Sequence, residues 1–153
     1  MQQVYAKQAH VTYYARYHVV WIPKYRNNIL VKGVDSYCKI KILEVTKWYP
    51  DIQFIEINVQ KDHVHALVTY PSTYGMGKVM NIIKSNTSRA LREKFSFLKK
   101  VYPTGGIWSV GYFFSTVGIN EEVIRQYIRN QEKEDKGQAQ LVMFSEPTSV
   151  RAW

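Results

Sequence analysis

The chain has 153 residues, of which 46% are hydrophobic, so we expect one folded domain and exclude wholesale disorder. A net charge of +9, spread along the chain, favours a polyanionic partner, with nucleic acid ahead of acidic membrane; a basic protein without such a partner is the alternative. The single cysteine excludes an intrachain disulfide, and without a signal sequence or an apolar run of membrane-spanning length we expect a cytoplasmic protein.

The first part of the chain predicts a strand, a helix and a second strand. Residues 11–22 are rich in Val, Thr, Tyr and Trp, which favours a strand, and the basic, aromatic loop Lys24-Tyr25-Arg26 follows it. Apolar residues at helical spacing predict a helix over residues 34–49. Residues 52–59 have the composition of a second strand. One face of that strand would carry Ile55, Ile57 and Val59.

A third strand, reaching to about Tyr70, contains His63-Val64-His65. Alternate side chains of a strand point to the same face, so both imidazoles would point the same way. Two imidazoles at that spacing can hold one divalent ion. The simpler alternative is a pair of hydrogen-bonded histidines near a strand end. A metal site is favoured only if the chain also supplies a nucleophile and a third ligand.

The second part of the chain predicts a long helix, a strand and a last helix. Residues 76–95 form an amphipathic pattern, with Lys84 and Arg89 among the basic residues largely off its apolar stripe. Such residues could follow a phosphate backbone, although a solvated charged face is commoner. Residues 107–117 are rich in aromatic residues and predict a fourth strand. Asn120 is a suitable N-cap for a helix that runs to about residue 133.

This order is β-α-β-β-α-β with an added C-terminal helix, which predicts an α+β, ferredoxin-like fold. In that topology both helices cover one face of an antiparallel sheet, and the first and third strands are central neighbours. The other face is open to the added helix or to a ligand. We expect one domain over residues 1–133 and a tail, residues 134–153, for which the sequence predicts no structure.

The last helix supplies a candidate nucleophile and a candidate ligand. Tyr127 and Gln131 are four residues apart and therefore share a helix face. The amide oxygen of Gln131 could complete a coordination sphere begun by two imidazoles, which suits Mg²⁺, Mn²⁺ or related ions without choosing among them. The Tyr127 hydroxyl could then attack a phosphodiester and form a phosphotyrosine. Helix periodicity alone favours a packed core tyrosine instead.

Several motifs together resemble one family. His63-Val64-His65 fits the His-hydrophobic-His motif of the HUH endonuclease superfamily. Tyr127-Ile128-Arg129-Asn130-Gln131 resembles the tyrosine helix of the single-tyrosine HUH transposases of small bacterial and archaeal insertion sequences. Residues 17–26 resemble that family's first strand and basic loop, and residues 115–118 resemble the stretch before its last helix. The match covers about residues 12–132 in the family's order and spacing.

The resemblance implies a DNA transposase that recognises single-stranded hairpins near element ends. It would cleave through a 5′-phosphotyrosine with Mg²⁺ or Mn²⁺, and it would act as a homodimer with sites that two chains can share. By position, Tyr127 would be the nucleophile and His63, His65 and Gln131 the metal ligands. The remaining candidates are Lys24, Tyr25, Arg26, Lys84 and Arg89 for DNA binding, and His18 and Asn130 for structural or supporting roles.

Two further features bear on the assembly of the site. Residues 107–117 would form a long apolar strand at the sheet edge, and such an edge tends to pair with a second copy of the chain. Relatives often have more than one small residue after the Ser-Thr-Val stretch, whereas here Ile119 follows Gly118. If that linker must bend, it would be stiffer in this chain.

Three other classes of protein are alternatives. A REP-associated tyrosine transposase or a replication-type nicking enzyme would share the motifs and differ in its DNA target. A non-catalytic, ferredoxin-like nucleic-acid-binding module would have no reason to combine His-x-His with a Tyr/Gln helix. A two-histidine phosphoesterase is disfavoured because the chain has no second His-x-Ser/Thr element.

Overall fold

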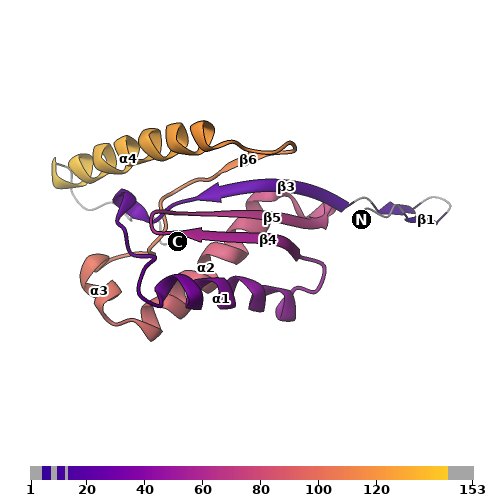
Figure 1. Ribbon diagram of the computed structural model, residues 1–153, viewed down its shortest axis with the longest axis horizontal. Helices are drawn as coiled ribbons and strands as arrows, with labels where there is room; N and C mark the ends of the chain where they lie inside the picture. The colour runs from indigo at the N-terminus through magenta and orange to yellow at the C-terminus, as the bar shows by residue number, and fades with distance from the viewer. Residues whose placement is uncertain (1–4, 8–9, 13, 145–153) are drawn as a thin grey trace.

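The computed structural model describes residues 5–7, 10–12 and 14–144, and at its centre is a four-stranded antiparallel sheet (Figure 1). The strand order is β4-β5-β3-β6. These strands are β3 (Tyr14–Trp21), β4 (Gln53–Gln60), β5 (His63–Pro71) and β6 (Phe113–Ser115). A separate hairpin precedes them, made of β1 (Tyr5–Lys7) and β2 (His10–Thr12).

Two helices cover one face of the sheet and a third covers the other (Figure 1). α1 (Val34–Trp48) and α2 (Met76–Lys94) lie on one face, and α4 (Glu121–Phe144) lies across the opposite face. The short elements are η1 (Lys24–Arg26), η2 (Ser72–Tyr74) and α3 (Phe97–Val101). The order β3-α1-β4-β5-α2-β6 confirms the predicted ferredoxin-like α+β fold, with β3 and β5 as central neighbours.

The alternation of β5 explains why the histidines face α4. Val64, Ala66, Val68 and Tyr70 are buried in the main core with the apolar residues of α1 and α2. Each buried valine contributes about 1.5–3 kcal/mol relative to an exposed one, so this face is fixed against the helices. The intervening residues, including the two histidines, must then point to the other face. The core therefore sets the orientation of the site.

Strand β4 departs from the predicted pattern at Ile55. The pairing of β4 with β5 is irregular between Phe54 and Glu56, and Ile55 is 46% exposed. Ile57 and Val59 pack against the main core as predicted. The prediction that Ile55 shares their face is wrong, because the β-bulge inserts one residue and reverses the alternation there.

The fourth strand is much shorter than predicted. Only Phe113–Ser115 pairs with β3, whereas Ile107 and Trp108 are fully buried in the main core. The Lys24 amide donates to the carbonyl of Ile107 (2.9 Å), and the Ser109 amide donates to the carbonyl of Ile22 (2.9 Å). This segment thus passes the end of β3 and enters the core. The predicted long edge strand over residues 107–117 is wrong.

The last helix begins as predicted and continues further. The Asn120 side chain accepts a hydrogen bond from the Val123 amide at 2.9 Å, which confirms the N-cap. α4 continues past residue 133 to Phe144, so part of the expected tail is helical, while residues 145–153 lie outside the described residues. Among the helices described, none has both the length and the apolar character needed to cross a membrane.

Candidate functional site

The sheet face under α4 carries three histidines. The strand register places His65 opposite Val20 of β3, His18 opposite Leu67 of β5, and Gln60 of β4 opposite His63. Paired residues of antiparallel strands share a face, so His18, His63 and His65 all point towards the α4 side, as predicted for the His-x-His pair. Nδ1 of His18 lies 3.3 Å from Nε2 of His65, so His18 contacts the pair directly.

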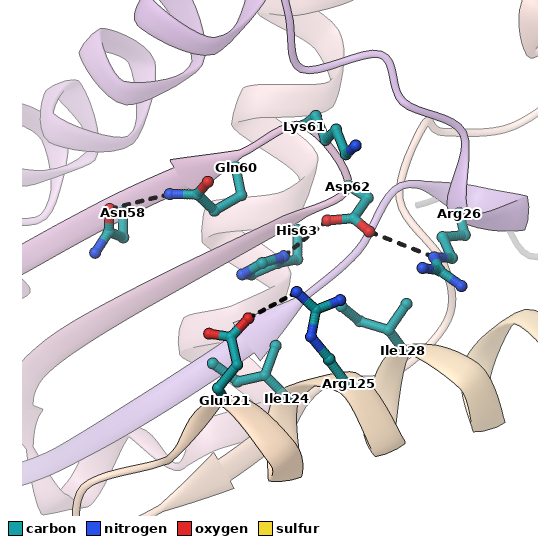
Figure 2. Close-up of a pocket in the computed structure, with 10 residues that line it drawn as sticks. All are labelled: Arg26, Asn58, Gln60, Lys61, Asp62, His63, Glu121, Ile124, Arg125 and Ile128. Atoms are coloured by element: carbon teal, nitrogen blue, oxygen red, sulfur yellow. Dashed lines mark hydrogen bonds and ion pairs between the residues drawn. The ribbon is translucent and has the colours of Figure 1, made fainter.

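His63 also lines a pocket of about 530 Å³ between the β4–β5 turn and the first half of α4 (Figure 2). Figure 2 shows His63 and Asp62 on the strand side, facing Ile124, Arg125 and Ile128 of the helix. The complete lining is Arg26, Asn58, Gln60, Lys61, Asp62, His63, Glu121, Ile124, Arg125 and Ile128. The wall is mostly polar, which suits a hydrated or charged ligand better than an apolar one.

A carboxylate adjoins the first histidine of the pair. Oδ1 of Asp62 lies 2.9 Å from Nδ1 of His63, and Oδ2 accepts from Nε of Arg26 at 3.3 Å. Burial by itself raises the pKa of Asp62, but its bonds to His63 and Arg26 and their charges outweigh burial, so the pKa lies below its usual value. Asp62 is therefore a carboxylate at neutral pH. Sequence reasoning treated Asp62 as a turn residue and missed these contacts.

The second histidine is held in its neutral form. Burial lowers the pKa of His65, and the charges of His18 and His63 lower it further. Neutral imidazole is the form that binds metals, so the donor chemistry of this pair fits a divalent ion such as Mn²⁺. In the part of the chain that the structure describes, no three His, Cys, Asp or Glu side chains are grouped to hold a metal. A third ligand would therefore come from outside these four residue types.

Tyr127 packs under α4 as part of a second apolar cluster. It packs against the buried cluster of Val20, Ile22, Ile124 and Ile128 and stacks at a tilt on Phe113, with ring centroids 5.9 Å apart. Its hydroxyl is buried and has no hydrogen-bond partner within the described residues. Burial raises the pKa of Tyr127, and the charges of Asp135 and Glu134 raise it further. Tyr127 is therefore close to the histidine-bearing face, but it does not line the pocket with His63.

Gln131 also lies outside that pocket. It is 8% exposed, and its Nε2 donates to the carbonyl of Val110 at 2.7 Å. Its Oε1 faces Gly111, where an added Cβ would lie 3.8 Å away. The structure thus places the two candidate residues of α4 on one stripe of the helix, with Gln131 bonded to the segment before β6. It does not place the Gln131 amide in the same pocket as His63.

A third residue of this stripe, Asp135, was missed by sequence reasoning. It is 4% exposed; Oδ1 accepts from the Ser109 hydroxyl at 2.7 Å, and Oδ2 accepts from the Tyr25 amide at 3.0 Å. Its spacing of eight residues from Tyr127 puts it on the same helix face. The position of a carboxylate on an otherwise largely apolar helix face is the sequence signal that could have indicated a buried, hydrogen-bonded Asp135. Asp135 joins α4 to η1 and to the segment before β6.

The structure corrects the position of Lys84. This side chain is fully buried, and its Nζ donates to the carbonyls of Ser109 at 2.8 Å and Gly111 at 2.5 Å. Burial lowers the pKa of Lys84 to about 7, although the charge of Asp135 acts in the opposite direction. Lys84 therefore does not lie on the charged face of α2, and the prediction of a surface DNA contact there is wrong. Arg89 is exposed on α2, across the sheet from α4.

The basic loop forms η1 beside α4. Tyr25 and Arg26 have positive φ values of 62° and 55°, a conformation uncommon outside glycine. Arg26 forms an ion pair with Asp62, and its Nη1 lies 3.8 Å from Oε1 of Glu132 in α4. Burial lowers the pKa of Lys24, and the charge of Asp135 offsets part of that effect. The DNA contacts of this loop remain predictions, as does any role of the exposed Asn130.

Comparison with known proteins identifies close relatives. Residues 11–131 match the family described as "Transposase IS200 like". The transposase for insertion sequence element IS200 of Salmonella typhimurium is 32% identical over 133 residues, which cover 87% of each chain. The ISDra2 transposase TnpA of Deinococcus radiodurans is 28% identical over 120 residues, covering 78% of this chain and 85% of the relative.

Solved structures agree with the fold. A crystal structure described as a transposase from Deinococcus radiodurans superimposes with a TM-score of 0.69 at 25% identity, covering 83% of this chain and 97% of that one. A REP-associated tyrosine transposase bound to a REP hairpin superimposes with a TM-score of 0.51, covering 84% of this chain and 68% of that one. Its 14% identity limits this second likeness to the fold.

Proposed function

Because this chain belongs to the IS200-like transposase family, we propose that it cleaves and rejoins single-stranded DNA at insertion-sequence ends through Tyr127. A transposase cuts and transfers DNA strands, so membership of the family makes the chain an enzyme of that class. The observation that best supports the specific mechanism is the placement of α4. The helix that carries Tyr127 packs on the sheet face that also carries His63 and His65.

In the proposed cleavage step, the Tyr127 oxygen attacks a backbone phosphorus. The new bond joins tyrosine to the 5′ side of the break, the bond from phosphorus to the 3′ oxygen breaks, and the 3′ oxygen leaves as a hydroxyl after taking up a proton. The tyrosine proton passes to solvent. The phosphotyrosine preserves the phosphoester, so a later 3′-hydroxyl can displace tyrosine and rejoin a strand. Because the hydroxyl is buried with a raised pKa, it must become exposed before it can react.

We propose that His63 and His65 hold Mg²⁺ or Mn²⁺, with Gln131 as a third ligand. The lowered pKa of His65 favours the neutral imidazole that metals bind, while Gln131 would have to move, because it lies outside the pocket that His63 lines. A bound divalent ion supplies charge neutralisation at the scissile phosphate. The chain itself orients the two imidazoles through the rigid central strand β5.

The proposed partner is single-stranded DNA that forms hairpins near the element ends. A relative of the same fold has been solved bound to a REP hairpin, and the net charge of +9 favours a phosphate backbone. Lys24, Tyr25, Arg26 and Arg89 are the proposed DNA contacts. We also propose a homodimer, because moving an element requires two ends to be held together and each chain supplies one Tyr127.

A covalent-adduct assay tests the nucleophile. Purified protein with Mg²⁺ and a single-stranded element end should form a denaturation-resistant protein–DNA adduct, and Tyr127→Phe should bind DNA without forming it. Tyr74→Phe is a matched control, since its hydroxyl donates to Asp51, neither residue belongs to α4 or lines the pocket with His63, and its adduct yield should not change. An undiminished adduct in Tyr127→Phe would exclude this residue as the nucleophile.

The same assay tests the metal ligands. His63→Ala and His65→Ala should each lose cleavage while keeping most of their DNA affinity, because affinity comes mainly from phosphate contacts. Normal cleavage by His65→Ala at limiting Mn²⁺ would show that the pair is not the metal site. A REP-associated or replication-type nicking enzyme would form the adduct on a different DNA, whereas a non-catalytic module would bind DNA and form none.

A further inference from the structure

We infer that Asp62 is a positioning residue that fixes the orientation and the tautomer of His63, and that Arg26 in turn holds Asp62. The inference deepens the proposed function, since His63 matters to the reaction only if that pair binds a metal ion. Its first part, the tautomer, can nevertheless be measured in the protein without metal or DNA. Figure 2 shows the three side chains in sequence along one side of the pocket.

The bond between Asp62 and His63 determines which ring nitrogen carries hydrogen. An ionised carboxylate can only accept hydrogen bonds, so at 2.9 Å from Oδ1 the Nδ1 atom of His63 must be the donor. In neutral imidazole the lone pair is then on Nε2. Because His63 lines the pocket, Nε2 is the nitrogen available to a ligand there. The carboxylate thus selects the coordinating atom.

The backbone makes this contact possible. Consecutive residues of a strand point to opposite faces, so a carboxylate within β5 beside His63 would point away from it. Asp62 instead lies in the turn between β4 and β5, immediately before the first residue of β5. From the turn its side chain can fold back onto the face of His63. The contact depends on this boundary between turn and strand.

Both oxygens of Asp62 are occupied, which prevents the carboxylate from rotating away. Oδ2 accepts from Nε of Arg26, and the side chains of Asp62 and His63 are only 12% and 14% exposed. Shielding from water strengthens such bonds. The Arg26 amide donates to the carbonyl of Pro23 at 3.0 Å, and its Nη1 lies 3.8 Å from Oε1 of Glu132, so its backbone and its guanidinium both have partners. Arg26 of η1 therefore holds Asp62 in place, and Asp62 in turn holds His63.

A carboxylate on the outer nitrogen of a ligating imidazole has a known physical effect. It fixes the ring and makes the coordinating nitrogen more basic, and its loss typically weakens metal binding about 10–100-fold. A purely structural ion pair would have no such effect on metal affinity. Asp62 therefore differs in a measurable way from an ordinary surface carboxylate.

Two readouts test the inference in the full-length chain. Nitrogen-15 NMR of the imidazoles should show His63 as the Nδ1–H tautomer in the unmodified protein and as a mixture in Asp62→Ala. Titration with Mn²⁺ alone, followed by electron paramagnetic resonance, should give about 10–100-fold weaker binding in Asp62→Ala. Asp51→Ala, which removes a carboxylate bonded to Tyr74 at the opposite end of β4, should change neither readout.

A second variant keeps the test valid if Asp62→Ala does not fold. Arg26→Gln leaves the bond to His63 intact but frees Oδ2, and it should give a smaller loss of Mn²⁺ affinity in the same direction. An unchanged tautomer together with unchanged Mn²⁺ binding in the folded variants would overturn the inference. If the unmodified protein binds no Mn²⁺ but Asp62→Ala still alters the tautomer, the proposed metal site fails and the positioning role stands.

Discussion

At the residue scale, the hydroxyl group of Tyr127 is not expected to stabilise the folded state. The hydroxyl is buried and unpaired within the described part of the chain, and burying such a group without a partner is unfavourable. Tyr127→Phe should therefore leave the free energy of unfolding unchanged or raise it by about 1 kcal/mol. Urea denaturation followed by far-UV circular dichroism measures this.

Tyr102→Phe is the matched comparison for that prediction. The Tyr102 hydroxyl is also buried, but it donates to the carbonyl of Lys24 at 2.9 Å, so its removal should lower the free energy of unfolding by about 1 kcal/mol. A loss of stability in Tyr127→Phe as large as that in Tyr102→Phe would contradict the prediction. A hydroxyl retained without a folding role is consistent with a chemical one.

Lys84 leads to a prediction about pH. Burial lowers its pKa to about 7, whereas the unfolded chain should titrate near the ordinary value of 10.5. Between these values the unfolded state binds more protons, so the contribution of Lys84 to stability rises with pH. The difference in unfolding free energy between the unmodified protein and Lys84→Met should increase from pH 7 to pH 9, by up to about 1.4 kcal/mol per unit.

Urea denaturation at several pH values measures that difference. The comparison with Lys84→Met is needed because other groups titrate in the same range. Loss of the bonds to Ser109 and Gly111 should destabilise the variant at every pH, so only the slope reports on titration. Parallel stability profiles for the two proteins would show that Lys84 stays charged in the folded state.

The orientation of the histidine pair could be predicted from the sequence, whereas the burial of Lys84 could not. The common face of His63 and His65 follows from strand alternation, which is a local property. The burial of Lys84 does not, because its partners Ser109 and Gly111 lie 25 and 27 residues away. The contact of Tyr25 with Asp135 spans 110 residues and was equally inaccessible. Periodicity describes one element, whereas these contacts need the positions of several.

At the element scale, polar contacts hold the middle of α4 to the body of the protein. Asp135 accepts from the Ser109 hydroxyl and the Tyr25 amide, and Gln131 donates to Val110. Asp135→Ala leaves two buried donors without their acceptor, which should lower the free energy of unfolding by about 1–3 kcal/mol for each. Amide hydrogen exchange over residues 121–137 should accelerate, because the helix would lose its anchor.

Glu134→Ala serves as the control for Asp135→Ala. Glu134 neighbours Asp135 on the same helix but is exposed, so its removal should change exchange in α4 very little. Equal exchange rates in both variants would show that the apolar contacts of Ile124 and Ile128 hold the helix without help. The experiment thus separates polar anchoring from hydrophobic packing.

Most elements could be predicted from the sequence, and the two largest failures have different causes. The helices α1 and α2 and the strands β3, β4 and β5 lie within a few residues of their predicted bounds. Residues 107–109 have strand-like composition mainly because they are buried; their pairing is limited to one bridge between Trp108 and Pro23, beyond the end of β3. β-Branched and aromatic residues are common both in buried segments and in paired strands, so composition could not distinguish the two. The extension of α4 to Phe144 had no periodic signal in the sequence.

At the scale of the whole molecule, the proposed site residues of one chain do not all line the same pocket. His63 lines one pocket, whereas Tyr127 and Gln131 make contacts outside it. Mixing Tyr127→Phe with His63→Ala/His65→Ala, each inactive alone, should restore cleavage if the proposed homodimer shares its sites. The adduct assay on the mixture measures this. If the chains exchange freely, half of the dimers are heterodimers with one complete site each, so the adduct yield should reach about a quarter of that of the unmodified protein.

Two results would oppose that prediction in different ways. If heterodimers form but the mixture stays inactive, each site is built within one chain. If light scattering at micromolar concentration shows a monomer, the dimer itself is excluded. The short β6 leaves less edge for pairing than residues 107–117 were expected to offer, so the outcome bears directly on which surface joins the chains.

The connection between β6 and α4 has a consequence for the integrity of the chain. Val117 is 68% exposed, and no atom lies within 4 Å of a Cβ placed on Gly118, so this stretch offers a protease an accessible bond. The helix beyond it is attached by its apolar stripe and by Gln131 and Asp135, none of which depends on that bond. A molecule nicked here would keep its two fragments associated, and the tyrosine could then be supplied as a separate peptide.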